Sequence, residues 1–577
     1  MPRLQTLLLR LASWLDAREV SVWYDPHYRL PLSSLEGVVG MEPRRADFAA
    51  WWLRECGAAR KRAFRKPHRI SYENLARVHT PELLESLGRP EELARIFAVD
   101  PSDVPVDEVM TTVRLACGGT LGAARETLRT SAPALNLLGG FHHASPGVAG
   151  GFCPVNDIAV AVATLRAEGF AGEVAVLDLD AHPPDGLGAC LAPDPRAWVG
   201  SLSGSDWGPI PRVDETVLPP GTGDAAYLDA LAALLRRMPR PKLAFVIAGG
   251  DVLAGDRFGQ LGLSVGGART RDLRVASALD GVATVWLPGG GYSPDAWRVL
   301  AGTGMAVAAA SAEAIPAKYD PLQARYARVS ASMSPAELTE KGDLTAEELD
   351  EALGLRPRRQ RLLLGFYTAS GMEHALYRYG TFDHLERLGF RQFRIVFDVA
   401  GLGERVRLLG QAGGEEHLLI ETVLEKRRVL GVEVLYVHWL SLRNPLAQFS
   451  PRRPRLPGQE VPGLGLAREV GTMFARMAVR LGLGGVVFRP AHYHSAYAAR
   501  HEFAFVDPER QGRFEALVRD LASVPLLEAT LAVAEGRVRM DGVPYQWEAD
   551  EMAYWLRESP ADPGEVERER ERVRFSI

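Results

Sequence analysis

Apolar runs of strand length alternate with helical patterns from about residue 20 to residue 315. The clearest runs show no regular polar alternation, and they cover residues 135–138, 174–179, 243–248 and 283–287. Parallel strands that are covered by helices on both faces have this composition. Helical patterns such as those at 158–165 and 227–235 lie between the runs. The pattern therefore predicts an α/β domain built on a parallel sheet.

The pattern changes after this first region. Ser334 precedes Pro335 within a stretch of weaker periodicity, which favours a helix start at that point. Strand-like runs and helical patterns then return and predict a second, smaller α/β or α+β domain. We therefore expect a first domain over 1–315, a helical linker over 316–358 and an accessory domain over 359–577.

Composition limits the classes of partner. The 577 residues are 47% hydrophobic and carry a formal net charge of -5, which argues against holding nucleic acid by bulk charge. The four cysteines show no CxxC spacing, so reduced thiols are favoured over a disulfide scaffold. The helical pattern over residues 4–15 is interrupted by charges and predicts an amphipathic helix, not a targeting signal. We expect a cytoplasmic protein without a membrane partner or direct contact with nucleic acid.

Four short loops carry the candidate chemistry, and each follows one of the apolar runs. They cover residues 139–143, 178–182, 251–256 and 289–292. The carboxyl ends of parallel strands meet at one edge of a sheet, where active sites form. The sequence therefore predicts that a histidine pair, an Asp-x-His, further aspartates and a tyrosine after three glycines converge there.

The Asp-x-His pattern predicts a metal site. Asp180 and His182 share one side of an extended chain because alternate residues point to the same face. A third carboxylate would complete a catalytic zinc site that keeps positions for water and substrate. We expect Asp256 to be this ligand, and Asp251, which is nearer the strand end, is the alternative.

These loops resemble the motifs of the histone deacetylase family, in order along the chain. Residues 139–144 and 151–157 are similar to its histidine loop, 178–182 to its metal loop, 250–259 to its third-ligand loop, 290–292 to its tyrosine loop and 219–228 to a segment of its class IV-like branch. The resemblance covers about residues 20–310 and includes bacterial members of the acetoin-utilisation type. It implies an arginase/deacetylase-type fold and a metal-dependent amide hydrolase.

The resemblance also implies roles for individual residues. Its proton carriers would be His142 and His143, which share the tasks of deprotonating water and protonating the leaving amine, in an order that the sequence leaves open. Asp178 would orient His142 and Asp185 would orient His143. Tyr292 would donate its hydroxyl to the carbonyl oxygen of the substrate.

The remaining implied residues surround the substrate or a second ion. Gly151 and Phe152 would line a narrow apolar tunnel, and Asp103 would accept substrate amide hydrogens at its rim. The implied metal is Zn²⁺, with Fe²⁺ as an alternative. The resemblance further implies a potassium ion held through Asp178, Asp180, His182, Ser201 and Leu202.

Two departures from the family bear on these expectations. Pro183 and Pro184 stand where the family commonly has His-Gly, which removes a backbone donor and stiffens the loop. The family's usual histidine near residue 203 is absent and Trp207 follows, which alters a pocket wall. A two-metal, arginase-like enzyme would need Asp-x-His-x-Asp, and position 184 is proline, so one metal is favoured.

The second domain is loosely similar to GNAT-type N-acetyltransferases. Residues 459–466 approach that family's glycine-containing turn before a helix, with a spacing one residue longer. Acetyl-CoA binding there is the less favoured interpretation, and an accessory domain of another kind is the favoured one. His492 and His494 are interpreted as surface residues rather than metal ligands.

These patterns together predict a zinc-dependent deacetylase. Its substrate would be an acylated lysine peptide or an acylated small amine. The alternatives are a polyamine- or metabolite-directed amidohydrolase on the same fold, and a metal-bound binding module without turnover.

Overall fold

The computed structural model describes residues 20–32, 35, 39–308, 315–339, 362–451, 454–522, 524–557 and 562–577. The helix predicted over residues 4–15 and residues 340–358 of the predicted linker lie outside the described residues. The chain divides into two compact units between Pro321 and Leu322. Each unit is described by itself.

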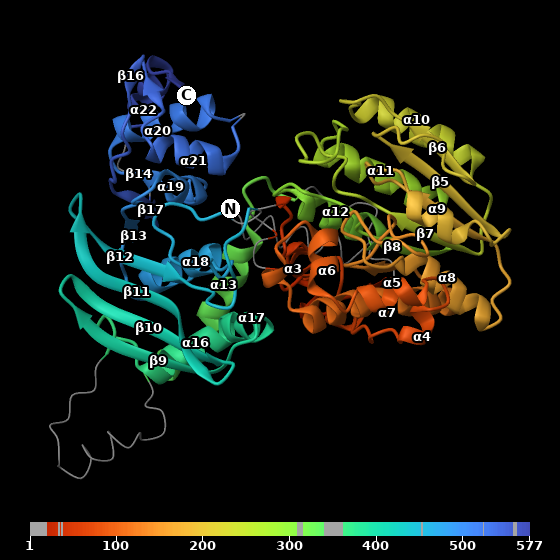
Figure 1. Cartoon of the computed structure of the whole chain (residues 1–577), viewed down its shortest axis with the longest axis horizontal. Coiled ribbons are helices and arrows are strands. Elements are labelled where there is room, and N and C mark those ends of the chain that lie inside the picture. Colours follow the sequence, from red (N-terminus) through yellow and green to blue (C-terminus); the bar gives the residue numbers. More distant parts are fainter. Residues whose placement is uncertain are drawn as a thin grey trace, which may run out of the picture. The chain divides into compact units, whose positions relative to one another are not determined.

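The first unit is built on one eight-stranded sheet in which every neighbouring pair of strands is parallel (Figure 1). Its order is β2-β1-β3-β8-β7-β4-β5-β6. The strands are β1 (Ser21–Trp23), β2 (Phe64–Arg65), β3 (Ala134–Asn136), β4 (Val174–Asp178), β5 (Ala197–Ser203), β6 (Val213–Val217), β7 (Leu243–Ile247) and β8 (Ala283–Leu287). The predicted parallel-sheet fold class is confirmed.

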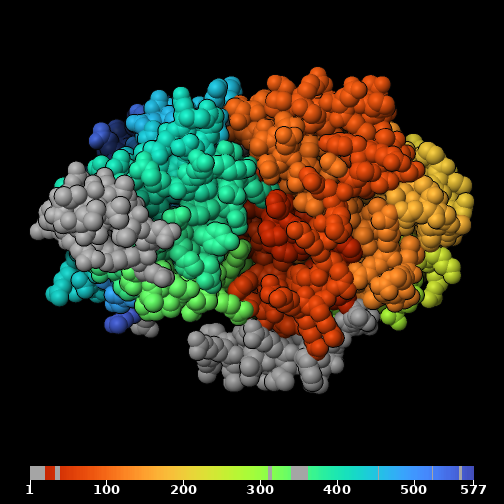
Figure 2. Space-filling model, turned by 90° about the horizontal axis from the view of Figure 1, so that it is seen from below, coloured from red at the N-terminus to blue at the C-terminus, as the bar shows by residue number. Residues whose placement is uncertain are grey.

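Helices flank this sheet. They are α3 (Arg45–Glu55), α4 (Tyr72–Leu75), α5 (Pro81–Ser86), α6 (Pro90–Phe97), α7 (Val106–Thr130), α8 (Asp157–Ala167), α9 (Asp185–Leu191), α10 (Asp224–Arg237), α11 (Val265–Ala278) and α12 (Ala296–Ala308). The segment from about residue 20 to residue 130 forms a continuous surface, red to orange in Figure 2. The central strands β4, β7 and β8 are buried along their whole length, which explains their uniformly apolar sequence.

The second unit contains a mixed sheet of seven strands in the order β14-β17-β13-β12-β11-β10-β9. Neighbouring strands are antiparallel throughout, except that β13 pairs with β12 in parallel. These strands are β9 (Arg391–Ala400), β10 (Gly403–Ala412), β11 (Glu415–Val429), β12 (Val432–Leu442), β13 (Gly485–Phe488), β14 (Ala504–Phe505) and β17 (Met552–Trp555). A three-stranded sheet holds β15 (Arg539–Met540), β16 (Val543–Pro544) and β18 (Phe575–Ser576).

The helices of this second part are α13 (Pro321–Ser332), α14 (Pro335–Thr339), α16 (Ala369–Tyr379), α17 (Thr381–Arg387), α18 (Ala467–Arg480), α19 (Tyr493–Ala499), α20 (Pro508–Asp520), α21 (Leu526–Ala534) and α22 (Pro563–Arg572). The helix start predicted at Pro335 is present, and the Ser334 side chain accepts the Glu337 backbone N–H at 3.3 Å. Among the described helices, none is both long and apolar enough to cross a membrane.

Candidate active site

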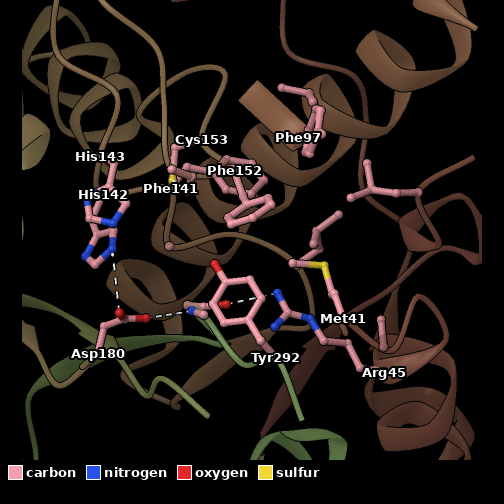
Figure 3. Close-up of a pocket in the computed structure, with 18 of the residues that line it drawn as sticks. Met41, Arg45, Phe97, Phe141, His142, His143, Phe152, Cys153, Asp180 and Tyr292 are labelled. Carbon is pink, nitrogen blue, oxygen red and sulfur yellow. Dashed lines mark hydrogen bonds and ion pairs between the residues drawn. The ribbon is translucent and has the colours of Figure 1, made fainter. Parts of the chain in front are cut away.

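A cavity in the first unit lies where the loops after β3, β4 and β8 meet. In Figure 3, His142, His143, Asp180, Phe152 and Tyr292 surround it. The strands that precede these loops are close neighbours in the sheet, so their carboxyl ends bring together side chains from distant parts of the chain.

Asp180, His182 and Asp251 form a compact group of metal-ligand type. Their donor atoms all lie within 4.8 Å of one another. His182 Nδ1 lies 3.2 Å from Asp180 Oδ1 and 2.9 Å from Asp251 Oδ2. Both carboxylates are buried. Two buried carboxylates keep their negative charges most easily beside a cation, and a neutral imidazole adds a third ligand atom. The donor set therefore fits a divalent metal ion.

The pKa values of this group reflect its crowding. Burial lowers the pKa of His182, but its hydrogen bonds to Asp180 and Asp251 outweigh burial and raise the value to about 11. Burial, reinforced by the charge of Asp180, raises the pKa of Asp251 to about 7. The group thus holds protons strongly, and a divalent ion would compete with those protons for the same atoms.

Two aspartates remain candidates for the third ligand, and they differ in their surroundings. Asp251 belongs to the cluster, whereas Asp256 does not. The Asp256 carboxylate accepts three backbone N–H groups, from Phe258 and Gly259 at 3.1 Å each and from Tyr292 at 2.7 Å. Oδ1 accepts the first two of these bonds and Oδ2 accepts the third. Asp256 therefore fixes the loop that carries Tyr292, and its expected role as a metal ligand stays a prediction.

The two adjacent histidines each make a pair with an aspartate. His142 Nδ1 lies 2.8 Å from Asp178 Oδ2, at the end of β4. His143 Nδ1 lies 2.7 Å from Asp185 Oδ1, at the start of α9. In each pair the carboxylate fixes the ring and leaves Nε2 for chemistry. The structure thus forms both predicted pairs, although Pro183 and Pro184 precede Asp185.

The two rings differ in their charge state. Burial lowers the pKa of His142, but the carboxylates of Asp178 and Asp180 outweigh burial and raise it to about 9. Burial and the neighbouring His142 lower the pKa of His143. The pair therefore combines a ring that holds its proton with a ring that readily stays neutral, which is the combination that acid and base catalysis needs.

Aromatic rings form the wall around Tyr292. The Tyr292 ring lies 5.0 Å from Phe152 and 4.9 Å from Phe258, measured between centroids. Phe152 has a φ of 64°, which a bulky residue rarely adopts. Such strain is maintained only where the surroundings impose it. Here it directs the Phe152 ring toward Tyr292, as Figure 3 shows.

Three glycines let the backbone approach the reactive groups closely. A Cβ atom at Gly289 would lie 2.7 Å from Asp180 Oδ2, and one at Gly290 would lie 2.7 Å from Asp251 Oδ2. A Cβ atom at Gly151 would lie 2.3 Å from the His143 ring. The expected tunnel residue Gly151 thus lines the cavity because it is small.

Two of the predicted potassium ligands lie on neighbouring strands. Ser201 in β5 is the parallel neighbour of Asp178 in β4. Its hydroxyl oxygen is buried and has no hydrogen-bond partner among the described residues. Leu202 follows it in the same buried strand. A buried oxygen of this kind beside a carboxylate strand end fits a monovalent cation.

Asp103 is not part of the cavity lining. It is the last residue of the short helix Pro101–Asp103, and its side chain is buried. Its expected role at the rim stays a prediction.

Sequence reasoning missed the role of two residues. Arg45 is buried against the cavity, and its guanidinium donates to the Gly289 carbonyl at 2.9 Å. Trp207, noted only as a departure, stacks on His143 with centroids 5.3 Å apart. Neither contact has a signal in the sequence, since Arg45 stands in an ordinary helix start and Trp207 in a long loop.

The second unit contains two features that the sequence analysis singled out, a pair of histidines and the segment 459–466. His492 and His494 stack with centroids 5.6 Å apart. The segment 459–466 precedes α18, and its resemblance to an acetyl-CoA turn stays a prediction.

Comparisons with known proteins match the same region. Residues 40–307 match the family model described as the histone deacetylase domain. Histone deacetylase 2 of Arabidopsis thaliana is 29% identical over 301 residues, which make up 49% of this chain and 77% of that protein. A probable deacetylase of Archaeoglobus fulgidus is 30% identical over 205 residues, or 32% of this chain and 56% of that protein.

An uncharacterized protein of Picosynechococcus is 34% identical over 186 residues, or 31% of this chain and 62% of that protein. The chain thus covers less than two thirds of the Picosynechococcus and Archaeoglobus proteins. The residues that match the family model include strands β2 to β8 and the loops that follow β3, β4, β7 and β8. Residues 40–307 of this chain are a histone deacetylase domain.

Proposed function

We propose that this domain hydrolyses N-acyl amides with the help of one divalent metal ion. The observation that carries the proposal is the convergence of two His–Asp pairs, Tyr292 and a three-donor cluster at one cavity. Each of these groups has a separate task in amide hydrolysis, and a binding module would need none of the proton carriers.

Asp180 and His182 would hold the metal, with Asp251 as the third ligand that the cluster favours and Asp256 as the one that the sequence predicts. The ion would be Zn²⁺, with Fe²⁺ as the alternative. When bound there, such an ion lowers the pKa of a water molecule, so that a hydroxide nucleophile is available near neutral pH, and it polarises the substrate carbonyl. A potassium ion would lie near Asp178 and Ser201, where the buried hydroxyl supports its placement.

The chain's own residues would manage the protons. His142 and His143 would take a proton from the attacking water and deliver one to the departing amine, each oriented by its aspartate. The Tyr292 hydroxyl, whose pKa burial raises well above its ordinary value, stays protonated and would donate to the carbonyl oxygen.

The cavity wall supports an acyl-amine substrate with an aliphatic stem. Phe152 and Phe141 present apolar rings to it, and Cys153 adds a small apolar side chain. An acylated lysine side chain or an acylated small amine fits this lining. Two of the relatives carry deacetylase names, which agrees with an acetyl group.

The test compares zinc-loaded chains on an acetyl-lysine peptide and on acetylspermidine. We expect release of free amine from at least one substrate, with Tyr292→Phe at least 100-fold slower. Tyr72→Phe is the matched control, because Tyr72 is exposed and far from the cavity lining. The proposal fails if zinc-loaded wild type and Tyr292→Phe are equally inactive on both substrates. The preferred substrate separates a peptide deacetylase from a small-amine amidohydrolase.

A further inference from the structure

A buried ion pair stands near the middle of helix α11. Arg271 and Asp272 have no exposed surface, and Arg271 Nε donates to Asp272 Oδ1 at 2.8 Å. Neither residue belongs to the cavity lining or to the donor cluster. A buried ion pair often adds little to folding, because the loss of hydration offsets the attraction between the charges. The other hydrogen bonds of the pair therefore indicate what it does.

The remaining bonds of Arg271 connect two loops. Its Nη1 donates to the carbonyl oxygen of Gly249 at 2.9 Å and to that of Leu179 at 3.2 Å. Leu179 directly precedes Asp180 in the loop after β4. Gly249 lies in the loop after β7, two residues before Asp251. One guanidinium thus binds the backbone of both loops that supply the donor cluster.

The two loops are closely packed at this point. A Cβ atom at Gly249 would lie only 2.7 Å from Asp180 Cα. The Ala181 backbone N–H donates to Asp251 Oδ1 at 3.0 Å, which joins the same two loops again. Because closely packed groups transmit small displacements, a shift of one loop would move its donor atoms relative to those of the other.

Asp272 fixes the guanidinium in turn. Its Oδ1 accepts Arg271 Nε, and its Oδ2 accepts the hydroxyl of Thr303 in α12 at 2.6 Å. The carboxylate thus balances the charge of Arg271 and ties it to a second helix. A planar guanidinium offers five N–H donors in a fixed fork, so it can bond one carboxylate and two carbonyl groups at once. A lysine ammonium has the same charge but lacks this fork.

We propose that Arg271 is a positioning residue for the metal site and that Asp272 holds it in place. The guanidinium sets the spacing between the loops after β4 and β7, and hence the spacing of the ligand atoms that they carry. The loop after β7 carries both candidates for the third ligand, so the role of Arg271 is the same with either. This inference rests on the divalent metal proposed for the cluster.

Zinc binding by the full chain in chelator-buffered solutions tests the proposal. The double variant Arg271→Met, Asp272→Leu replaces the ion pair with apolar side chains of similar volume, which folded proteins often tolerate. Thr303 keeps a partner in this variant, because its hydroxyl also lies 3.0 Å from the Val299 carbonyl oxygen. We expect the zinc affinity of the double variant to fall about 10- to 100-fold.

Arg166 and Asp194 supply a matched control. Arg166 Nε donates to Asp194 Oδ2 at 2.8 Å, and Arg166 Nη1 donates to the carbonyl oxygens of Phe170 and Gly172. The bonding pattern is the same, but both carbonyl groups precede β4 and lie at its other end. The double variant Arg166→Met, Asp194→Leu should therefore bind zinc like the wild type. Urea unfolding of the zinc-free chains checks that the two double variants lose similar stability.

Arg271→Lys keeps the charge without the fork, so its zinc affinity should fall less than that of the double variant. It decides the test if Arg271→Met, Asp272→Leu does not fold, and unchanged zinc affinity in Arg271→Lys then overturns the proposal. Equal zinc affinity in the wild type and the folded double variant also overturns it, as does an equal loss in the Arg166 control. A wild-type chain that binds no zinc overturns the metal site itself, and this inference with it.

Discussion

The indole ring of Trp207 lies almost parallel to the imidazole of His143, with centroids 5.3 Å and planes 28° apart. Trp207 is 53% exposed, so it covers the reactive ring with a side chain that also faces solvent. The stack limits the movement of His143 and shields one face of it from water.

Trp207→Ala is expected to lower kcat/KM for an acyl-amine substrate roughly two- to tenfold, because an aromatic stack contributes about 0.5–1.5 kcal/mol. Trp207→Phe keeps a ring at this position and should retain most of the activity. Steady-state kinetics of both variants check this. An alanine variant with unchanged kcat/KM would show that the stack has no catalytic consequence.

Asp185→Asn should lower kcat about 10- to 100-fold and leave KM nearly unchanged. The amide can still hydrogen-bond His143 Nδ1, but it no longer supplies the negative charge that raises the basicity of the ring. Asp194→Asn is the control, because Asp194 pairs with Arg166 away from the cavity lining. Equal loss in both variants would point to a general effect on folding.

The tasks of His142 and His143 can be separated with two leaving groups. An aromatic amine leaves without protonation, whereas an alkylamine needs a proton. We expect one of His142→Ala and His143→Ala, but not both, to recover activity when an acyl-lysine is replaced by an acyl p-nitroanilide. Equal suppression of both variants on both substrates would contradict a division of labour between the rings.

Asp251→Asn and Asp256→Asn should differ in metal content. Asp251 belongs to the donor cluster, so its variant should lose bound zinc on dialysis. Asp256→Asn should keep its zinc but unfold more easily, by about 1–2 kcal/mol, because the backbone N–H groups lose a charged acceptor. Elemental analysis and denaturant unfolding measure the two effects. Loss of zinc from Asp256→Asn alone would instead assign Asp256 as the third ligand.

Stability of the second unit should fall as pH is lowered from about 7 to 5. Burial, with a smaller contribution from the charge of His492, lowers the pKa of His494 to about 4, below the value of about 6.5 in an unfolded chain. Between these values the unfolded chain takes up a proton that the folded chain does not, so folding weakens as pH falls. His494→Gln should show a shallower slope in urea unfolding over this range. An identical slope would assign the effect to other groups.

The sequence predicted the strands of the first unit best where an apolar run is also buried on both faces of the sheet. The apolar run at 283–287 is a strand over those same residues. Both faces of this parallel strand are buried, so the apolar run begins and ends with the strand. The run at 135–138 gives only Ala134–Asn136, since Leu137 and Leu138 already belong to the loop that leads to the histidines.

The sequence predicted that Asp180 and His182 lie together, because they are only two residues apart in one short motif. The choice of Asp256 over Asp251 stays a prediction, because spacing along a loop does not show which carboxylate binds a metal and which is used by backbone N–H groups. Gly249 and Gly250 stand directly before Asp251. A Cβ at Gly249 would lie 2.6 Å from Asp251 Oδ1, so that glycine marks the closely packed carboxylate.

The glycines at 289 and 290 make the cluster vulnerable in a way that its charged residues do not reveal. Adding a single methyl group at either position would push against Asp180 or Asp251 without altering any ligand. A natural variant of this kind would keep every acid, imidazole and phenol of the reaction and still be inactive. Inventories of intact functional groups would therefore overestimate how many related sequences can act on a substrate.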